Sequence, residues 1–393
     1  MFEFTATPPL SLYIHIPWCV RKCPYCDFNS HEVREDLPEQ AYLAALVADL
    51  EQELPKVWGR TVETVFIGGG TPSLFSPEGI EQLLNAVRAR LPLKPDAEIT
   101  LEANPGTVDS ERFHGFREAG INRLSIGIQS FQPHQLRALG RIHDDSEAIA
   151  AVESASTAGF DNINLDLMFG LPGQDIAAAL DDLHTAAGYR PAHLSWYELT
   201  IEPNTWFYRH PPDRPEDELL WNMQQAGHDL LAGHGYSRYE VSAFARDDRR
   251  CRHNLNYWTF GDYIGIGAGA HGKLTDAAAQ SICRTAKIRH PRSYIEALQG
   301  QDPGVTTRLT ASDVLLEFCM NALRLEQGFS LETFTGNTGL QATAMLAACE
   351  SADADGLLEI RDKRIRCTDP GRRYLNDLLQ HFMQASDDDA RTG

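Results

Sequence analysis

Three cysteines near the N-terminus have a spacing that suits an iron-sulfur cluster. Cys19, Cys23 and Cys26 lie in the run HIPWCVRKCPYCDF, with three and then two residues between them. Thiolate sulfur is the preferred ligand of such clusters, and one short loop can bring three sulfurs to three corners of a [4Fe-4S] cube. The fourth iron is then open and can bind a small molecule. The spacing alone leaves a zinc site or buried thiols as alternatives.

Six short runs rich in β-branched and apolar residues alternate with segments of helical period. The runs read SLYIHI, VETVFI, AEITLE, RLSIGI, NINLDLMF and HLSWYEL and begin at residues 11, 62, 97, 123, 162 and 193. In the first helical segment the apolar residues fall on one face of a helix, namely Leu43, Leu46, Val47, Leu50 and Leu54. This alternation predicts parallel β/α units. Because a closed TIM barrel has eight units, we expect an α/β fold with a partial (β/α)6 barrel.

Polar residues and glycines follow or end several of these runs. The cysteines come after the first run, GGGTP at residues 68–72 after the second, and Glu102 ends the third. Gln129 follows the fourth, and Asp166 lies in the fifth. Since strand ends of a parallel barrel meet at one mouth, we expect these groups to converge there.

This set of residues suits S-adenosylmethionine (SAM). The glycine run lets the backbone approach a ligand closely, although a tight turn would also explain it. Glu102 alone could be an ordinary surface residue. With Gln129, Arg141 and Asp166, however, it offers acceptors for ribose hydroxyls and an ammonium group, and donors for a carboxylate. We therefore predict a SAM site beside the open iron.

In order along the chain, the CxxxCxxC run, GGGTP, the glutamate of LEANP, the glutamine of SIGIQSF and the aspartate of NLDLMFGLP resemble the radical SAM superfamily. More narrowly, they resemble the branch that contains the oxygen-independent coproporphyrinogen III dehydrogenases (HemN) and the related heme chaperones. The resemblance covers the chain from about Leu12 through its C-terminal part. It implies a [4Fe-4S] cluster held by the three cysteines, with SAM chelating the fourth iron and cleaved to a 5'-deoxyadenosyl radical. It also implies contacts to SAM from Tyr13, Tyr25, Gly69, Gly70, Thr71, Glu102, Gln129, Arg141 and Asp166.

Two departures separate this chain from the dehydrogenases of that branch. They carry another cysteine two residues after the third ligand, where this chain has Phe28. They also have an N-terminal extension before the first strand, whereas here that strand is expected near Ser11. Both differences argue against porphyrinogen decarboxylation.

The run HNLNYW at residues 253–258 matches the HNxxYW motif of the heme chaperones, where this motif is associated with heme binding. A neutral imidazole is a common ligand of heme iron, so His253 is a candidate, and Tyr257 and Trp258 could lie along a flat macrocycle. The alternative is a hydrogen-bonded loop histidine beside two packed aromatic rings. Cys251 is a further possible ligand, or a free thiol.

The run GAGAHG at residues 267–272 fits the GxGxxG pattern of dinucleotide sites. Such a site needs a helix directly after the glycines and an acidic residue about 20 positions later. The sequence shows neither, so we interpret these glycines as backbone near the SAM or heme pocket, or as a plain turn.

Composition narrows the class of protein. There are 55 acidic and 35 basic side chains, and the net charge of -20 disfavours nucleic acid as a partner. Five of the eight cysteines are scattered, which is not the pattern of a disulfide framework, so we expect a reducing cytoplasm. Neither a signal peptide nor a transmembrane segment is evident.

The pattern changes near residue 306. Thr310 and Asp313 form a capping box before a helix that ends close to Gly328. The run LLEIRDKRIRCT reads as a hairpin turning at Asp362 and Lys363, and Pro370 should open a last helix through residue 383. We therefore expect a radical SAM core over 4–240, a connecting segment over 241–305, a HemN-like, winged-helix-like domain over 306–383 and a disordered tail over 384–393.

The resemblance implies a heme chaperone that binds the cluster, SAM and heme and passes heme to an acceptor protein, with a reductant protein as a further partner. The alternative is an oxygen-independent coproporphyrinogen III dehydrogenase of porphyrin biosynthesis. A third possibility is an enzyme acting on another substrate, so whether the chain is an enzyme stays open.

Overall fold

The computed structural model describes residues 2–34, 36–300 and 302–392, with side chains described up to Met383. All six predicted strands are present and pair in parallel in chain order. They are β1 (Leu10–Ile16), β4 (Val62–Gly69), β5 (Leu93–Ala103), β6 (Arg123–Gln129), β7 (Ile163–Phe169) and β8 (His193–Glu198). The partial barrel is therefore confirmed.

The sheet extends beyond these six strands at both ends. Next to β1 lies the parallel strand β11 (Asp262–Ile266), followed by the antiparallel strands β12 (His271–Asp276), β13 (Ser281–Lys287) and β14 (Gly304–Arg308). Next to β8 lies β10 (Ala243–Ala245), antiparallel to it, and β9 (Ser237–Glu240) pairs antiparallel with the far side of β10. Much of the segment after residue 240 thus continues the sheet of the barrel.

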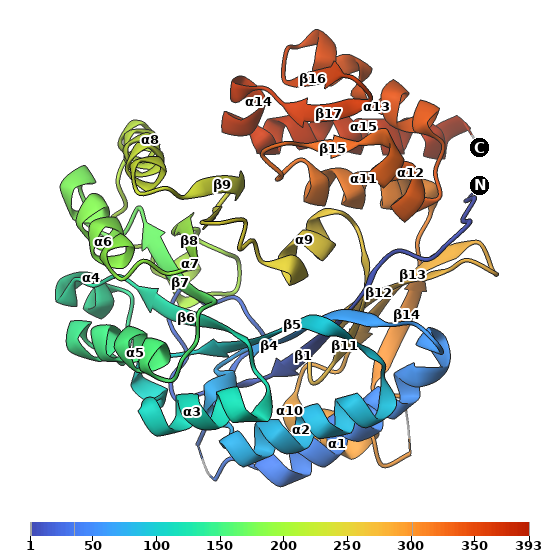
Figure 1. Ribbon diagram of the computed structural model, residues 1–393. Helices are drawn as coiled ribbons and strands as arrows, with labels where there is room; N and C mark the ends of the chain where they lie inside the picture. Colours follow the sequence, from blue (N-terminus) through green and yellow to red (C-terminus); the bar gives the residue numbers. More distant parts are fainter. Residues whose placement is uncertain (1, 35, 301, 393) are drawn as a thin grey trace.

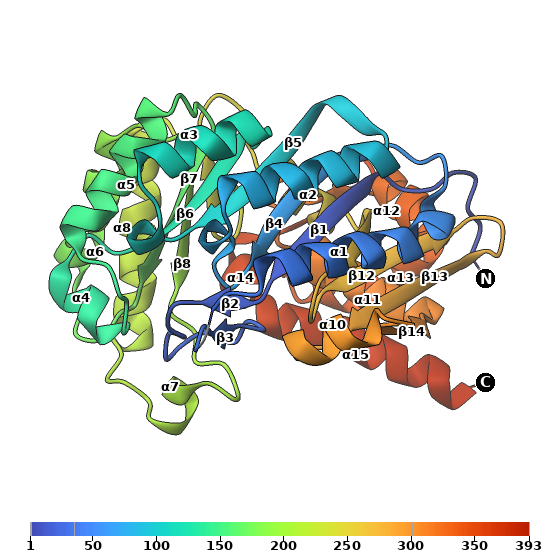
Figure 2. The ribbon, with the colours of Figure 1, turned by 90° about the horizontal axis from the view of Figure 1, so that it is seen from below.

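Helices cover the outer face of the curved sheet, as Figure 2 shows. They are α1 (Glu39–Glu53), α2 (Pro77–Arg90), α3 (Ser110–Ala119), α4 (Pro133–Ala138), α5 (Asp145–Thr157), α6 (Ile176–Gly188), α8 (Asp217–Gly233) and α10 (Pro291–Ala297). On α1 the predicted apolar face is buried at Leu43, Leu46 and Leu50. The main apolar core lies between these helices and the sheet. Removing its side chains from water is the main stabilising contribution to the barrel.

The cysteine segment and several loops carry short elements. These are β2 (Trp18–Cys19), β3 (His31–Glu32), α7 (Trp206–Arg209), and the 3-10 turns η1 (Leu54–Val57), η2 (Pro72–Leu74) and η3 (Pro105–Thr107). Strands β2 and β3 pair with each other and close the cysteine loop.

The C-terminal residues form a domain with its own apolar core. It contains α11 (Ala311–Ala322), β15 (Phe329–Ser330), α12 (Leu331–Thr338), α13 (Ala342–Ala354), β16 (Leu358–Arg361), β17 (Arg364–Cys367), α14 (Asp369–Arg373) and α15 (Leu375–Thr392). The capping box at Thr310 and Asp313 is present, and the hairpin turns at Asp362 and Lys363, both with positive φ.

One prediction for this domain is wrong. The last helix is broken at Tyr374 (φ -113°, ψ 44°), so that Pro370 opens the short α14 and a separate α15 follows. A non-helical backbone at a single residue leaves no trace in a sequence whose apolar spacing continues on both sides. The side chains of 384–393 lie outside the described part, so the predicted tail stays a prediction.

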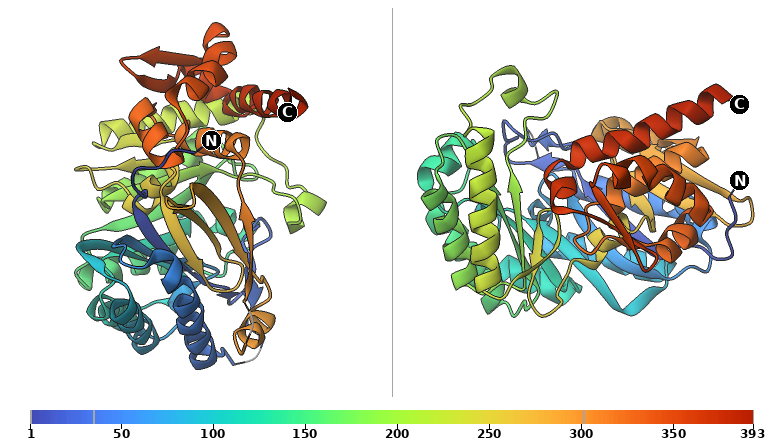
Figure 3. Two further views of the ribbon diagram at one scale, coloured as in Figure 1. Left: turned by 90° about the vertical axis from the view of Figure 1, so that its right-hand side faces the viewer. Right: turned by 90° about the horizontal axis from the view of Figure 1, so that it is seen from above.

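The C-terminal domain sits over the concave side of the barrel (Figure 1 and Figure 3). Between them lies α9 (Arg252–Trp258), which contacts β1 and β4 on one side and α11 on the other. The arrangement buries His253 and Asn256 of the HNLNYW segment and leaves its other four residues partly exposed. No helix in the described ranges is long and apolar enough to cross a bilayer.

Candidate functional site

The three cysteines lie on a loop that the end of β1 presents at the mouth of the barrel. The loop is closed by β2 and β3 and by backbone hydrogen bonds from Val33 to Cys19 and from Cys26 to Cys23. All three thiols are free and partly buried. Burial raises the pKa of Cys19 to about 11, and it also raises the pKa of Cys26. Binding to iron must therefore release protons from the ligand-free loop.

A cavity of about 260 Å³, here called the cysteine cavity, brings the predicted cluster and SAM residues together. Besides the three cysteines, it is lined by Tyr25, Gly69, Gly70, Thr71, Glu102, Gln129, Arg141 and Asp166. Of the predicted SAM contacts, Tyr13 alone lies elsewhere. The cavity thus joins the cysteine loop to the ends of successive strands. Within the described chain, no three His, Cys, Asp or Glu side chains are placed to hold a single metal ion.

The glycine run fits tightly against the cysteine segment. Gly69 has a φ of +120°, and a Cβ there would lie 2.6 Å from the ring of His15. At Gly70 a Cβ would lie 2.5 Å from the carbonyl oxygen of Trp18. The N–H groups of Gly70 and Thr71 donate to the carbonyls of Ile16 and Trp18. Glycines at positions 69 and 70 are therefore required for the end of β4 to pack against the segment that carries Cys19.

Two partly buried carboxyl groups lie on neighbouring walls of the cysteine cavity. The pKa of Glu102 is raised to about 7, chiefly by burial and also by the nearby Asp166, while the Gly69 N–H and Arg123 partly oppose the rise. Burial also raises the pKa of Asp166, whose carboxylate accepts hydrogen bonds from Asn164 (2.8 Å) and Ser125 (3.0 Å). Both groups can accept hydrogen bonds from ligand hydroxyls or an ammonium group.

Arg141 supplies positive charge to the same cavity. Its Nη2 donates to Asn104 and to the Gly127 carbonyl, and its Nη1 lies 3.6 Å from the sulfur of Cys23. Its buried Nε has no hydrogen-bond partner among the described residues. The guanidinium group therefore places positive charge at the wall of the cysteine cavity, next to Cys23.

Sequence reasoning missed several polar side chains of this cavity, among them Tyr197 and Asn104. Tyr197 donates a 2.7 Å hydrogen bond to Gln129, whose own backbone has a φ of +69°. Asn104 accepts from Arg141. Tyr197 lies in the HLSWYEL run, so the strand-end argument could have found it, whereas Asn104 lies in the LEANP loop beyond its strand.

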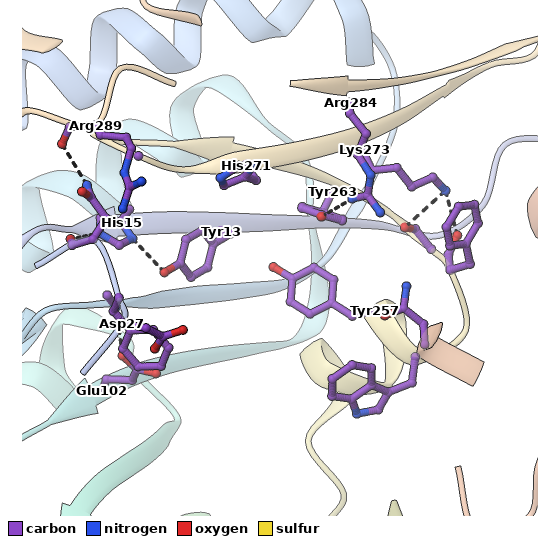
Figure 4. A pocket seen from close by; sticks show the side chains of 18 residues that line it. Tyr13, His15, Asp27, Glu102, Tyr257, Tyr263, His271, Lys273, Arg284 and Arg289 are labelled. Carbon is purple, nitrogen blue, oxygen red and sulfur yellow. Dashed lines mark hydrogen bonds between the residues drawn. The ribbon is translucent and has the colours of Figure 1, made fainter. Parts of the chain in front are cut away.

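A second, larger cavity of about 560 Å³ adjoins the first and contains Tyr13 (Figure 4). We call it the aromatic cavity, because six aromatic rings line it: Tyr13, Phe28, Tyr257, Trp258, Phe260 and Tyr263. Cationic or imidazole side chains also line it, namely His15, His271, Lys273, Arg284 and Arg289. Phe28, Gly69 and Glu102 line both cavities. The two spaces therefore share one wall.

The structure separates the residues of the HNLNYW motif. Tyr257 and Trp258 line the aromatic cavity, whereas His253 does not. His253 is 1% exposed, its Nδ1 lies 2.8 Å from the hydroxyl of Thr64, and its Nε2 lies 2.9 Å from the hydroxyl of Tyr257. Burial, aided by Arg123, lowers the pKa of His253 to about 3. The imidazole is thus neutral, and both ring nitrogens are engaged.

Cys251 lines neither cavity. It is fully buried at the start of α9, with its sulfur 3.7 Å from Glu98, and burial raises its pKa to about 12. Glu98 also accepts from the backbone N–H of His253 (3.0 Å). These contacts are those of a buried thiol that anchors the helix.

The GAGAHG run forms the connection between β11 and β12. A strand follows the glycines where a dinucleotide site needs a helix. The prediction that this run is not a dinucleotide site is therefore confirmed. Backbone N–H groups of this turn donate to the Tyr42 hydroxyl and the Asp49 carboxylate on α1. Gly269 and His271 line the aromatic cavity. Sequence reasoning found the glycines but not the role of the histidine after them.

Comparison with protein families identifies two segments. A model of the radical SAM superfamily matches residues 13–186, and a model of the HemN C-terminal domain matches residues 309–374. The solved structure of coproporphyrinogen III oxidase (HemN) from Escherichia coli superposes with a TM-score of 0.80 at 24% identity, covering 96% of this chain and 90% of that one. This likeness establishes the fold.

Curated relatives match over nearly their full length. The heme chaperone HemW of Escherichia coli is 50% identical, covering 96% of this chain and 98% of its own. The heme chaperone HemW of Haemophilus influenzae is 47% identical over the same shares. That of Bacillus subtilis is 33% identical, covering 95% of this chain and 99% of its own.

Proposed function

The chain belongs to the heme chaperone HemW family, and on that premise we propose that it binds a [4Fe-4S] cluster, SAM and heme and delivers heme to an acceptor protein. The observation that carries the proposal is the common wall of Phe28, Gly69 and Glu102 between the two cavities. One cavity has the donor set for a cluster with SAM, and the other has the volume and the aromatic lining that suit a flat aromatic ligand.

In the cysteine cavity, Cys19, Cys23 and Cys26 would hold the cluster. When bound, such a cluster supplies an electron and an open iron for the amino and carboxylate groups of SAM. The donor set fits this group, since three free thiols on one closed loop face a polar cavity.

The remaining polar groups of the cysteine cavity suit the other parts of SAM. Glu102 and Asp166 would accept from ribose hydroxyls or the ammonium group. Arg141 would attract the carboxylate through its positive charge, and the Gln129 side chain, which accepts from Tyr197, lines the same cavity. Gly69, Gly70 and Thr71 leave the backbone accessible, and Tyr25 lies on the cavity wall. Tyr13 lines the adjoining aromatic cavity instead.

The aromatic cavity would hold heme. Its volume lies within the roughly 300–1,000 Å³ typical of small-molecule sites, and it combines apolar rings with a few polar groups. Tyr257 and Trp258 would pack on the macrocycle. His253 belongs to this site through its hydrogen bond to Tyr257.

Partners and compartment are part of the same proposal. A chaperone of this kind needs a heme-acceptor protein, and a reducible cluster needs a reductant protein. All eight cysteines are free in the structure, which supports a reducing cytoplasm. The net charge of -20 supports partners other than nucleic acid.

The decisive test compares chaperone with dehydrogenase. The reconstituted protein is incubated with SAM, a reductant and coproporphyrinogen III, and vinyl-group formation is followed. The proposal predicts no turnover, whereas catalytic formation of vinyl groups would replace it with the dehydrogenase of porphyrin biosynthesis. Release of 5'-deoxyadenosine, measured with and without heme, would reveal an enzyme acting on another substrate.

A further inference from the structure

The aromatic cavity contains several side chains that can bind heme iron, and most of them are already engaged. Histidine and tyrosine are among the residues that bind heme iron in proteins. The hydroxyl of Tyr13 lies 3.0 Å from Nδ1 of His15, and Nε2 of His15 lies 2.8 Å from the Asn29 carbonyl. Tyr257 is bound to His253, and Tyr263 accepts from Arg284. Tyr13, His15 and Tyr257 would each have to give up a hydrogen bond in order to bind iron. Tyr263 would have to lose its proton, which burial opposes by raising its pKa.

His271 differs from all of them. It is an exposed residue at the start of β12, it lines the aromatic cavity, and neither ring nitrogen has a hydrogen bond to any described residue. Partial burial and the nearby guanidinium groups of Arg284 and Arg289 lower the pKa of His271. A neutral imidazole with a free nitrogen is the form that binds iron.

The position of His271 is rigid. It pairs with Ala286 in the β12–β13 ladder, and Lys273, two residues later on the same face, pairs with both Tyr263 on β11 and Arg284 on β13. These strands present His271, Lys273, Tyr263 and Arg284 to one side of the cavity (Figure 4). Sites built on strands hold their groups more precisely than sites built on loops.

The cationic side chains of this wall are not equivalent. Lys273 is fully buried in an ion pair with Asp262 (2.9 Å), and Arg284 is paired with Glu317. Arg289 is exposed and belongs to none of the ion pairs found in the described chain. It is therefore the cation that can receive a carboxylate without losing another.

We propose that His271 is the protein ligand of heme iron and that Arg289 binds a heme propionate. His253 acts as a positioning residue, because its hydrogen bond fixes Tyr257 from outside the aromatic cavity. This inference rests on the proposed heme binding. His253 of the HNLNYW segment is then not the iron ligand, because its imidazole would have to break its hydrogen bonds to Thr64 and Tyr257 and leave the core.

The test uses the full-length, cluster-reconstituted protein and ferric heme. Heme titrations are combined with EPR and magnetic circular dichroism, which identify the axial ligand. His271→Ala is expected to lose the imidazole signature and at least ~10-fold in affinity, the loss seen when even an outer-shell partner of a metal ligand is removed. Added imidazole should restore the signature, and His271→Cys should replace it with that of a thiolate.

Other variants complete the design. Arg289→Gln should weaken heme binding without changing the signature, and His253→Gln should retain it. His114→Ala, exposed on α3, serves as the matched control, and cluster absorbance reports intact folding. An unchanged imidazole signature in His271→Ala, or its loss in His253→Gln alone, would overturn this inference while leaving heme binding in place. Absence of saturable heme binding by the wild-type protein would overturn the proposed function as well.

Discussion

The backbone N–H of Gly69 donates a hydrogen bond of 2.9 Å to the carboxylate of Glu102, and both residues line both cavities. Gly69 ends β4 and Glu102 lies one residue before the end of β5, so the bond joins two adjacent parallel strands at the barrel mouth. A ligand in either cavity therefore meets the same pair. Substitutions at Gly69 or Glu102 should therefore change ligand binding in both cavities.

Glu102 should make stability depend on pH. Between pH 4.5 and about 7 the folded protein keeps a proton on Glu102 that the unfolded chain releases, so this group lowers the free energy of unfolding as pH rises. The effect is about 3 kcal/mol at most. Glu102→Gln should remove it, which denaturant unfolding of the ligand-free protein at several pH values would measure.

Other buried groups also make the free energy of unfolding depend on pH. Buried histidines such as His253, whose pKa is lowered, make it rise with pH, so a control variant is needed to isolate the effect of Glu102. Glu111→Gln, on the exposed face of α3, should keep the wild-type dependence. Identical pH profiles for wild type and Glu102→Gln would show that Glu102 titrates normally.

Gly70 should tolerate no side chain. A Cβ would lie 2.5 Å from the carbonyl oxygen of Trp18, next to Cys19, so Gly70→Ala must displace the cysteine loop. We expect a loss of about 1–3 kcal/mol in unfolding free energy and weaker SAM binding, measured by denaturation and calorimetry. Gly188→Ala, where a Cβ meets no atom within 4 Å, is the matched control. Normal SAM affinity in Gly70→Ala would refute the tight packing of this wall.

The cysteine loop should account for all cluster binding. Cys19→Ala is expected to lose iron and SAM binding together, as followed by absorbance and iron content after reconstitution. Cys283→Ala, a partly buried thiol on β13, should bind both normally. Retained cluster absorbance in Cys19→Ala would contradict the ligand set.

His253 should matter for both stability and heme. His253→Ala leaves the hydroxyls of Thr64 and Tyr257 without their imidazole partner, at a cost of about 1–3 kcal/mol in unfolding free energy. Heme binding should weaken because Tyr257 loses its support, while the cluster spectrum stays intact. Thermal unfolding and heme titration measure the two effects, and unchanged heme affinity would remove His253 from the site.

Much of the barrel and of the cysteine cavity could be predicted from the sequence. Buried parallel strands appear as continuous apolar runs, and strand ends converge by topology, so Glu102, Gln129 and Asp166 could be placed near the cysteines. The extension of the sheet by β11–β14 was harder to foresee, since hairpin strands carry weaker apolar patterns than buried parallel ones.

The burial of His253 could not be predicted, because it depends on how α9 packs between the barrel and the C-terminal domain. The motif HNLNYW is the same whether its histidine faces a cavity or the core. His271, in contrast, was visible in GAGAHG, but its exposure to the aromatic cavity follows from the pairing of β12 with β11 and β13.

The central claim is that the aromatic cavity binds heme, and titrating heme into the reconstituted protein tests it most directly. We predict saturable binding of one heme per chain, weakened in Trp258→Ala, which alters the cavity wall, and unchanged in Trp206→Ala, which is 60% exposed and lines neither cavity. Absence of saturable binding, or equal binding by wild type and Trp258→Ala, would contradict the account.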